Sequence, residues 1–270
     1  MRELSAFLAN IAQETNGSSA PMFNGNYQLT TPGALGVAYG LFASSEGSCK
    51  NDASCTSYGT KSNYCNVNFS GPTGSVGLCY GYGVDDTTVP FCKLAKEFCA
   101  DPSVQAATNS SDTNNQYYGR GGKQLSYPYN YIYYGSIVNP NDKLDLAKNP
   151  NKLQENGELG WATALAFWSY PFPKTSPAGQ DKPSMHEGFF TATNVGITDF
   201  DNLVGFGKTV NIINGGVECG KNRTYVPVTT LNRINSYLEL LFLTNHKIPI
   251  TKVEVTRDVN GAEVVDIVNS

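Results

Sequence analysis

The sequence predicts a mainly α-helical chain with two lobes, long loops closed by disulfides and a small β-hairpin near the C-terminal end. Three observations support this prediction. Several segments repeat apolar residues with the period of an α-helix, six of the seven cysteines lie between Cys49 and Cys99, and Asn260-Gly261 separates two valine-rich runs. A chain of 270 residues is also long enough to bury a large core without a metal.

The first helix is predicted from an apolar repeat at the start of the chain, formed by Leu4, Phe7, Leu8, Ile11 and Ala12. Asn16-Gly17 supplies the signal that ends it. Glu14 then falls in the last turn, about 80° from the direction of Leu4 at the helical rotation of about 100° per residue. We therefore expect its carboxylate at the edge of the buried face.

Further helices are predicted along the chain. Lys93 to Cys99 indicates a short helix that ends before Asp101-Pro102. Trp161, Leu165 and Trp168 place one apolar face on a helix that Pro171 and Pro173 terminate. Residues 109–116 are polar and are expected to form a linker.

The C-terminal third predicts two helices and a hairpin. Phe206 to Ile213 indicates a buried helix that Asn214-Gly215-Gly216 breaks. Apolar residues from Leu231 to Phe242 have helical spacing and predict a long amphipathic helix with Arg233 and Glu239 on its polar side. Residues 250–269 are expected to form the hairpin, because Asn-Gly is the strongest short turn signal.

Charge and cysteine usage limit the classes of function. The net charge is -4, so there is no basic surface for nucleic acid, and no apolar run approaches the roughly 20 residues that span a bilayer. We therefore expect no nucleic-acid or membrane partner. The clustered cysteines include no Cys-x-x-Cys pair, and His186 and His246 lie far away in sequence, which favours three disulfides over zinc. Fifteen pairings of six cysteines remain open.

Residues 117–131, Tyr-Tyr-Gly-Arg-Gly-Gly-Lys-Gln-Leu-Ser-Tyr-Pro-Tyr-Asn-Tyr, combine aromatic rings with amide and hydroxyl side chains. This mixture suits carbohydrate, because sugar rings have apolar faces that aromatic rings cover and hydroxyl edges that need donors and acceptors. A tyrosine-rich surface loop with a glycine turn is the alternative interpretation on composition alone.

The segment resembles the Tyr-Tyr-Gly-Arg-Gly-x-x-Gln-Leu-Ser-x-x-Tyr-Asn-Tyr motif of family 19 glycoside hydrolases, the plant-type endochitinases of the lysozyme-like superfamily. Other landmarks occur in the order of that family. Gln13-Glu14-Thr15 is similar to its His-Glu-Thr motif, Ala164 to Trp168 to its Ala-x-x-Phe-Trp, and Asn211 to Gly220 to its Asn-Ile-Ile-Asn-Gly-Gly-x-Glu-Cys-Gly. The resemblance implies a lysozyme-like fold with a cleft between two lobes.

The resemblance also implies residue roles in the hydrolysis of a glycosidic bond, which takes one carboxylic acid and one carboxylate. Glu14 matches the catalytic acid, Glu46 the base, and Ser126 the serine that helps hold the attacking water. The positions that match binding of the N-acetylglucosamine chain are Gln124, Tyr129, Asn130, Asn214 and Arg233. Glu218 and Arg233 match a charged pair beside the acid, for which a surface ion pair is the alternative interpretation.

Two departures from the family pattern bear on these roles. Gln13 stands where plant members have histidine, which leaves the acid in place but changes its hydrogen-bonding environment. The segment between Glu46 and Tyr64 is longer than in plant members, and Asp52 and Asp85 are the fallback positions for the base. The family's counterpart of Cys219 pairs with a later cysteine, which this chain lacks, so we expect Cys219 to be a buried thiol.

The predicted function is endo-hydrolysis of β-1,4 bonds in chitin by an inverting mechanism. The alternatives are a weakly active or inactive chitin-binding protein and a lysozyme-like peptidoglycan hydrolase. A Ser-His-Asp hydrolase is not favoured, because neither histidine has a Gly-x-Ser-x-Gly partner. We expect a secreted monomer without cofactor or metal, with a catalytic domain over residues 1–247, truncated at its N-terminus, and an extension over 248–270.

Overall fold

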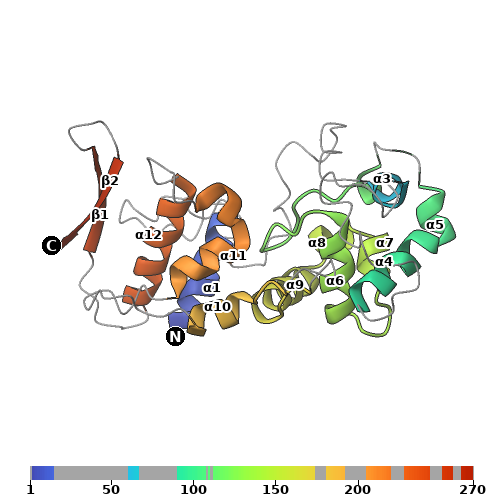
Figure 1. Ribbon diagram of the computed structural model, residues 1–270, viewed down its shortest axis with the longest axis horizontal. Coiled ribbons are helices and arrows are strands. Elements are labelled where there is room, and N and C mark those ends of the chain that lie inside the picture. The colour runs from blue at the N-terminus through green and yellow to red at the C-terminus, as the bar shows by residue number, and fades with distance from the viewer. Residues whose placement is uncertain are drawn as a thin grey trace. The chain divides into compact units, whose positions relative to one another are not determined.

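The computed structural model describes residues 2–14, 60–66, 90–107, 109, 112–173, 181–191, 205–219, 228–243, 251–257 and 263–269. These residues are mostly helical, as predicted (Figure 1). The chain divides into two compact units. The terminal unit joins the two ends of the chain, and the central unit contains the residues from 35 to 182. Within the described part of the chain, no helix is both long and apolar enough to cross a membrane.

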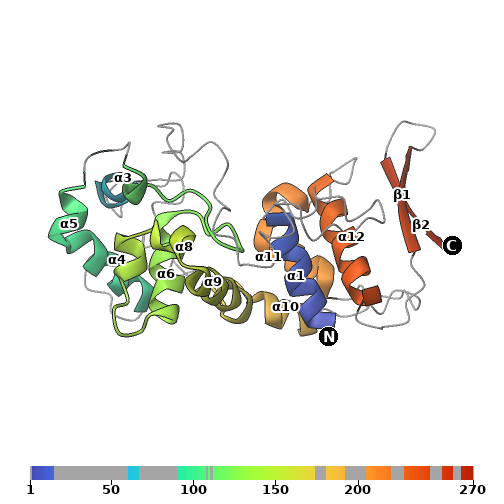
Figure 2. The same cartoon turned by 180° about the vertical axis from the view of Figure 1, so that it is seen from behind.

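The terminal unit consists of α1 (Arg2–Glu14), α10 (Met185–Thr191), α11 (Phe206–Glu218), α12 (Val228–Leu243), β1 (Thr251–Arg257) and β2 (Glu263–Asn269). Helix α1 packs against both α11 and α12, and the three lie side by side in Figures 1 and 2. This arrangement confirms the predicted helix over residues 4–14. It also places a segment from the N-terminus next to segments that follow it by some two hundred residues.

The buried face of α1 differs from the predicted one. Leu4 is 46% exposed, whereas Ala9 and Asn10 are fully buried together with Phe7 and Ile11. The alanines offer little side-chain volume, and their positions let two neighbouring helices approach α1 from different sides. Because α1 is enclosed in this way, one apolar stripe does not describe its burial.

The predicted hairpin is confirmed. Strands β1 and β2 are antiparallel, with Thr251 opposite Asn269 and Arg257 opposite Glu263. Its Asn260-Gly261 turn lies outside the described residues.

The central unit consists of α3 (Lys61–Asn66), α4 (Pro90–Ala100), α5 (Pro102–Gln105), the 3-10 turn η5 (Thr113–Asn115), α6 (Pro128–Val138), α7 (Asp145–Lys148), α8 (Lys152–Glu155) and α9 (Gly157–Ser169). Helix α6 contacts α4, α7 and α9, so it forms the middle of this unit. Helix α4 begins three residues before the predicted start, and Asp101 caps α5 by accepting a hydrogen bond from Ser103 N at 2.9 Å.

Two predictions about the central unit need correction. The predicted apolar face of α9 is buried in part, since Trp168 is 4% exposed whereas Leu165 is 51% exposed. Small residues such as Thr163 and Ala164 are buried instead and allow close packing. The predicted linker over residues 109–116 ends in buried residues, because Asn115 and Gln116 are each 1% exposed. The Asn115 amide is buried, donates to Ala107 O and Asn109 O, and accepts from Lys61 N at 2.9 Å.

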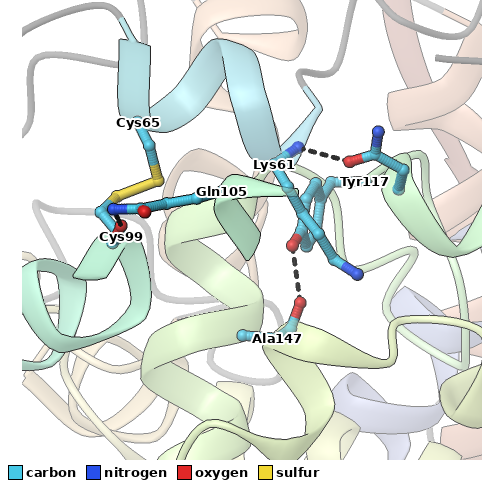
Figure 3. Close-up of a disulfide and its surroundings, with 7 residues drawn as sticks. Lys61, Cys65, Cys99, Gln105, Tyr117 and Ala147 are labelled. Carbon is cyan, nitrogen blue, oxygen red and sulfur yellow. Dashed lines mark hydrogen bonds between the residues drawn. A yellow bond between two sulfur atoms is a disulfide. The ribbon is translucent and has the colours of Figure 1, made fainter. Parts of the chain in front are cut away.

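A disulfide between Cys65 and Cys99 joins α3 to α4 (Figure 3). Nearby, Gln105 Nε2 donates to Cys99 O at 3.2 Å. Cys92 is also disulfide-bonded. The other predicted disulfide cysteines lie outside the described residues, so three bridges remain a prediction. Cys219 forms no disulfide, as expected, but it is half-buried and not fully buried.

The aromatic residues of the 117–131 segment form part of the core of the central unit. Tyr117, Tyr118 and Tyr131 have no exposed surface. The Tyr117 hydroxyl donates to Ala147 O at 2.6 Å (Figure 3), and the Tyr131 hydroxyl donates to Tyr118 O at 3.0 Å. These three rings therefore do not cover a sugar face, which corrects the expectation that the whole segment lines a cleft.

Arg120 explains why this segment holds its shape. Its buried guanidinium donates to Gln116 O at 2.9 Å, Thr113 O at 2.8 Å and Asn151 Oδ1 at 2.9 Å, and it lies 3.6 Å from the centre of the Tyr118 ring. Buried charge is costly unless its donors are satisfied, and here oxygens of the surrounding backbone and side chains accept from the two terminal nitrogens Nη1 and Nη2. The guanidinium thus joins η5, the N-cap residue of α8 and the 117–131 segment.

Candidate active site

A buried ion cluster lies where α1, α11 and α12 meet in the terminal unit. At its centre is Arg233 of α12, whose side chain is 2% exposed. Arg233 Nε donates to both carboxylate oxygens of Glu218, at 3.1 and 3.0 Å, and Nη2 donates to Glu218 Oε1 at 2.8 Å. The Glu218 side chain is completely buried. Arg233 therefore does not lie on a polar, solvent-facing side of α12 as predicted, and the pair is not a surface ion pair.

Glu14 is the second carboxylate of the cluster. Arg233 Nη2 also donates to Glu14 Oε1, so one nitrogen serves carboxylates from two helices. The Glu14 side chain keeps 18% of its surface exposed, unlike its two charged neighbours. Of the three charged groups, Glu14 is thus the one with access to solvent.

Asn10 and Thr209 complete the cluster and were not identified from the sequence. Arg233 Nη1 donates to Asn10 Oδ1 at 3.1 Å, and Asn10 Nδ2 donates to Thr209 Oγ1 at 3.1 Å. Both side chains are fully buried. The sequence could have indicated Asn10, because it lies next to Ile11 in an apolar helix, where a buried polar side chain needs a hydrogen-bond partner.

Asn214 shapes the end of α11. The predicted break is confirmed, because Asn214 has non-helical backbone angles, φ -143° and ψ 32°, and kinks the helix there; a further helical stretch then reaches Glu218. The Asn214 amide Nδ2 donates to Glu218 Oε1 at 3.0 Å. The kink therefore adds a hydrogen bond to the buried carboxylate, which is a structural role for a residue that the sequence also suggested for sugar binding.

The environment of Glu218 favours its charged form. Burial alone would raise the pKa of this carboxyl, but the hydrogen bonds and charge of Arg233, together with Asn214 and Thr230, hold the pKa below its usual value. Opposing effects also act on the pKa of Arg233. Burial would lower the pKa of the guanidinium, yet Glu218 and Glu14 raise it. Arg233 and Glu218 thus form a permanent ion pair at neutral pH.

The cluster contains one guanidinium and two carboxylates. Arg233 and Glu218 neutralise each other, so Arg233 has a buried anionic partner that is independent of Glu14.

The predicted binding residues of the central unit lie on a tight turn. Arg120 and Leu125 pair through their backbones, with Leu125 N donating to Arg120 O at 2.9 Å, and residues 121–124 form the turn between them. Gln124 and Tyr127 have positive φ values of 48° and 70°, which non-glycine residues rarely adopt. Such backbone strain is concentrated at functional sites in many proteins.

Ser126, Tyr129 and Asn130 follow this turn and are all half-buried, in contrast to the fully buried tyrosines of the segment. Ser126 Oγ donates to Gln124 O at 2.9 Å, and Asn130 Nδ2 donates to Ser126 O at 2.8 Å. The Tyr129 ring stacks on Tyr127, and burial raises the pKa of Tyr129 to about 12. The sequence-predicted polar residues are therefore held in fixed positions.

Comparison with known proteins identifies the family of the chain. The model of the chitinase class I family, glycoside hydrolase family 19, matches residues 54–245. The chain belongs to this family. The match contains Ser126, Gln124, Glu218 and Arg233, whereas it begins after Glu14 and Glu46. The role of Glu14 therefore rests on its motif and on its contact with Arg233.

Several plant members of the family resemble the chain over part of its length. A basic endochitinase of Vitis vinifera is 40% identical over 109 residues, which are 39% of this chain and 31% of the relative. Endochitinase A2 of Pisum sativum is 32% identical over 156 residues, 56% of this chain and 41% of the relative. An endochitinase of Avena sativa is 36% identical over 113 residues, 41% of this chain and 51% of the relative. The matches thus span about a third to a half of these relatives.

A solved structure, chitinase C from Streptomyces griseus HUT6037, aligns with 90% of this chain and 59% of its own, with a TM-score of 0.43 and 19% identity.

Three predicted positions cannot be placed, because Glu46, Asp52 and Asp85 lie outside the described residues. Among the residues that the structure describes, no group of three or more histidine, cysteine or acidic side chains could hold a metal ion.

The cluster predicts a pH dependence of stability. Since the folded-state pKa of Glu218 lies below its unfolded value of about 4.3, its ionisation stabilises the fold above that pH, and the contribution is lost as pH falls through the folded-state value. Glu218→Gln should destabilise the protein at pH 7 by about 1.5 to 3 kcal/mol, the usual contribution of hydrogen bonds to a charged group, because Arg233 keeps Glu14 as a partner. Denaturant unfolding of both proteins from pH 7 to pH 3 measures the difference. A gap that stays constant below pH 4 would contradict the assignment.

Proposed function

We propose that the protein hydrolyses internal β-1,4 bonds between N-acetylglucosamine units of chitin, with inversion at the anomeric carbon. In this reaction Glu14 is the general acid, Glu46 the general base, and Ser126 helps hold the attacking water. The proposal is supported by membership of the chitinase class I family and by the similarity to plant endochitinases. Chitin oligomers are the proposed partners.

The observation that carries the proposal is the different exposure of the two carboxylates on Arg233. A general acid must reach the glycosidic oxygen, and Glu14 is the carboxylate with exposed surface. Glu218 is completely buried and already bonded by Arg233, so it is suited to hold the cluster together. Arg233 is equally buried, and we therefore assign it the positioning of Glu14 and not direct contact with the sugar.

The second half of the reaction needs a base and a held water. An inverting enzyme separates its two carboxyl groups by about 6.5 to 9.5 Å, which leaves room for that water. Glu46 is proposed as the base because its sequence context matches the family. A hydroxyl both donates and accepts, so Ser126 is chemically suited to orient the water.

Substrate binding is assigned to Gln124, Tyr129 and Asn130, with Asn214 as a fourth position. Amide side chains can accept from the N-H of an acetamide group and donate to its carbonyl. Three of these residues lie on or directly after the strained turn of the central unit, and all are half-buried. The Cys65–Cys99 disulfide in the same unit supports an extracellular location.

The first test removes the proton of Glu14. Glu14→Gln keeps the shape of the side chain, so turnover of chitin hexamer should fall by about 10² to 10⁴, the range attributed to general acid catalysis, while hexamer binding persists. Product analysis by chromatography measures turnover. Glu3→Gln is the matched control, because Glu3 lies in the same helix and its contact is with exposed His186.

Wild-type turnover in Glu14→Gln would rule out the acid assignment. If the unaltered protein binds hexamer but does not cleave it, the protein is a chitin-binding relative and not an enzyme. Cleavage of peptidoglycan in preference to chitin would identify a lysozyme-like hydrolase.

The second test concerns the base. Glu46→Ala should abolish turnover of chitin hexamer without unfolding the protein, because the proposal assigns this carboxylate to the chemistry alone. Asp52→Ala and Asp85→Ala should keep their activity. The first product should be the α-anomer. NMR of the freshly formed product measures the anomer directly. A β-anomeric first product, or full activity of Glu46→Ala, would contradict the inverting assignment.

A further inference from the structure

Gly119 lies directly against the two polar side chains assigned to substrate and water. It precedes Arg120, whose backbone pairs with Leu125, so residues 119 and 126 continue the two sides of the same tight turn. A Cβ atom at position 119 would lie 2.6 Å from Gln124 Oε1, 3.2 Å from Gln124 Cβ and 3.2 Å from Ser126 Oγ. The space that a side chain would fill is therefore occupied by the Gln124 amide.

The backbone at Gly119 does not by itself require glycine. Among the described residues, the glycines with positive φ are Gly121 and Gly205, and Gly119 is not one of them. An alanine could adopt the same backbone angles without strain. The missing side chain, and not conformational freedom, is what this position contributes.

The two neighbours of Gly119 differ in how easily they can move. Ser126 is held by its hydrogen bond to Gln124 O and by the bond from Asn130 Nδ2 to its own carbonyl oxygen. The Gln124 amide is the end of a flexible side chain, with a hydrogen bond of 3.3 Å from Nε2 to Gly121 O. A methyl group at position 119 would therefore displace the Gln124 amide first.

We propose that Gly119 is a positioning residue that provides the slot for the Gln124 carboxamide beside the Ser126 hydroxyl. This inference rests on the proposed function, since it takes Gln124 as a contact of the sugar acetamide and Ser126 as a contact of the water. A side chain in this slot would displace the Gln124 amide. Substrate binding would then weaken, which raises KM, whereas the rate of bond cleavage, kcat, would change little.

The experiment compares Gly119→Ala with Gln124→Ala, the double variant and Gly207→Ala. Gly207 is the matched control, because it is exposed in α11 and an added Cβ there meets nothing within 4 Å. Kinetics on chitin hexamer separate KM from kcat. Gly119→Ala should raise KM about tenfold, the loss expected for one well-placed hydrogen bond, with little change in kcat. Gly207→Ala should leave both unchanged.

The double variant tests whether the effect acts through Gln124. Once the amide is removed, Gly119→Ala should raise KM by less than about twofold further, because coupled residues show non-additive effects. An additive, roughly tenfold further increase would overturn the proposal, as would an unchanged KM in Gly119→Ala. If Gly119→Ala does not fold, the double variant should restore folding, and failure to do so would also overturn it.

One readout is independent of activity on chitin. The side-chain amide resonances of Gln124 in ¹⁵N-labelled protein should shift in Gly119→Ala and remain in place in Gly207→Ala. If the unaltered protein shows no action on chitin, the proposed function is wrong, and these resonances still decide whether Gly119 positions Gln124. Unchanged resonances in Gly119→Ala would overturn the inference.

Discussion

The buried guanidinium of Arg233 is the interaction on which the terminal unit depends. It bonds a carboxylate at the end of α1, a second carboxylate at the end of α11 and an amide in the middle of α1. A charge without these partners would be too costly to bury, and the partners in turn need the charge. Stability and function are therefore linked, because the contacts that fix three helices also fix the direction of Glu14.

The family motifs predicted that Glu218 and Arg233 form a charged pair beside Glu14, and in the structure these three side chains are in contact. The contact of Asn214 with Glu218 was not predicted. Periodicity did not predict the burial of Arg233. A helical pattern assigns charged residues to solvent, and it contains no information about a carboxylate on another helix. The same limit applies to Leu4, which fits the apolar repeat of α1 but is 46% exposed, since α1 is enclosed by two helices and not by one.

The 117–131 segment shows why composition alone is ambiguous. Its tyrosines suggested a sugar surface, yet Tyr117, Tyr118 and Tyr131 are buried around Arg120. The half-buried polar residues of the same segment remain the candidates for binding. The same segment thus contains both core residues and candidate site residues, and the burial of each side chain in the fold distinguishes them.

A double-mutant cycle of Glu14→Gln and Glu218→Gln measures most directly whether one guanidinium holds both carboxylates. In each single variant, Arg233 keeps one anionic partner, whereas the double variant leaves the charge buried without any. The free energy of unfolding at pH 7 should therefore fall in the double variant by at least about 1 kcal/mol more than the sum of the single losses. Losses that add within about 0.5 kcal/mol would show that Glu14 and Glu218 act independently, and would contradict their shared interaction with Arg233.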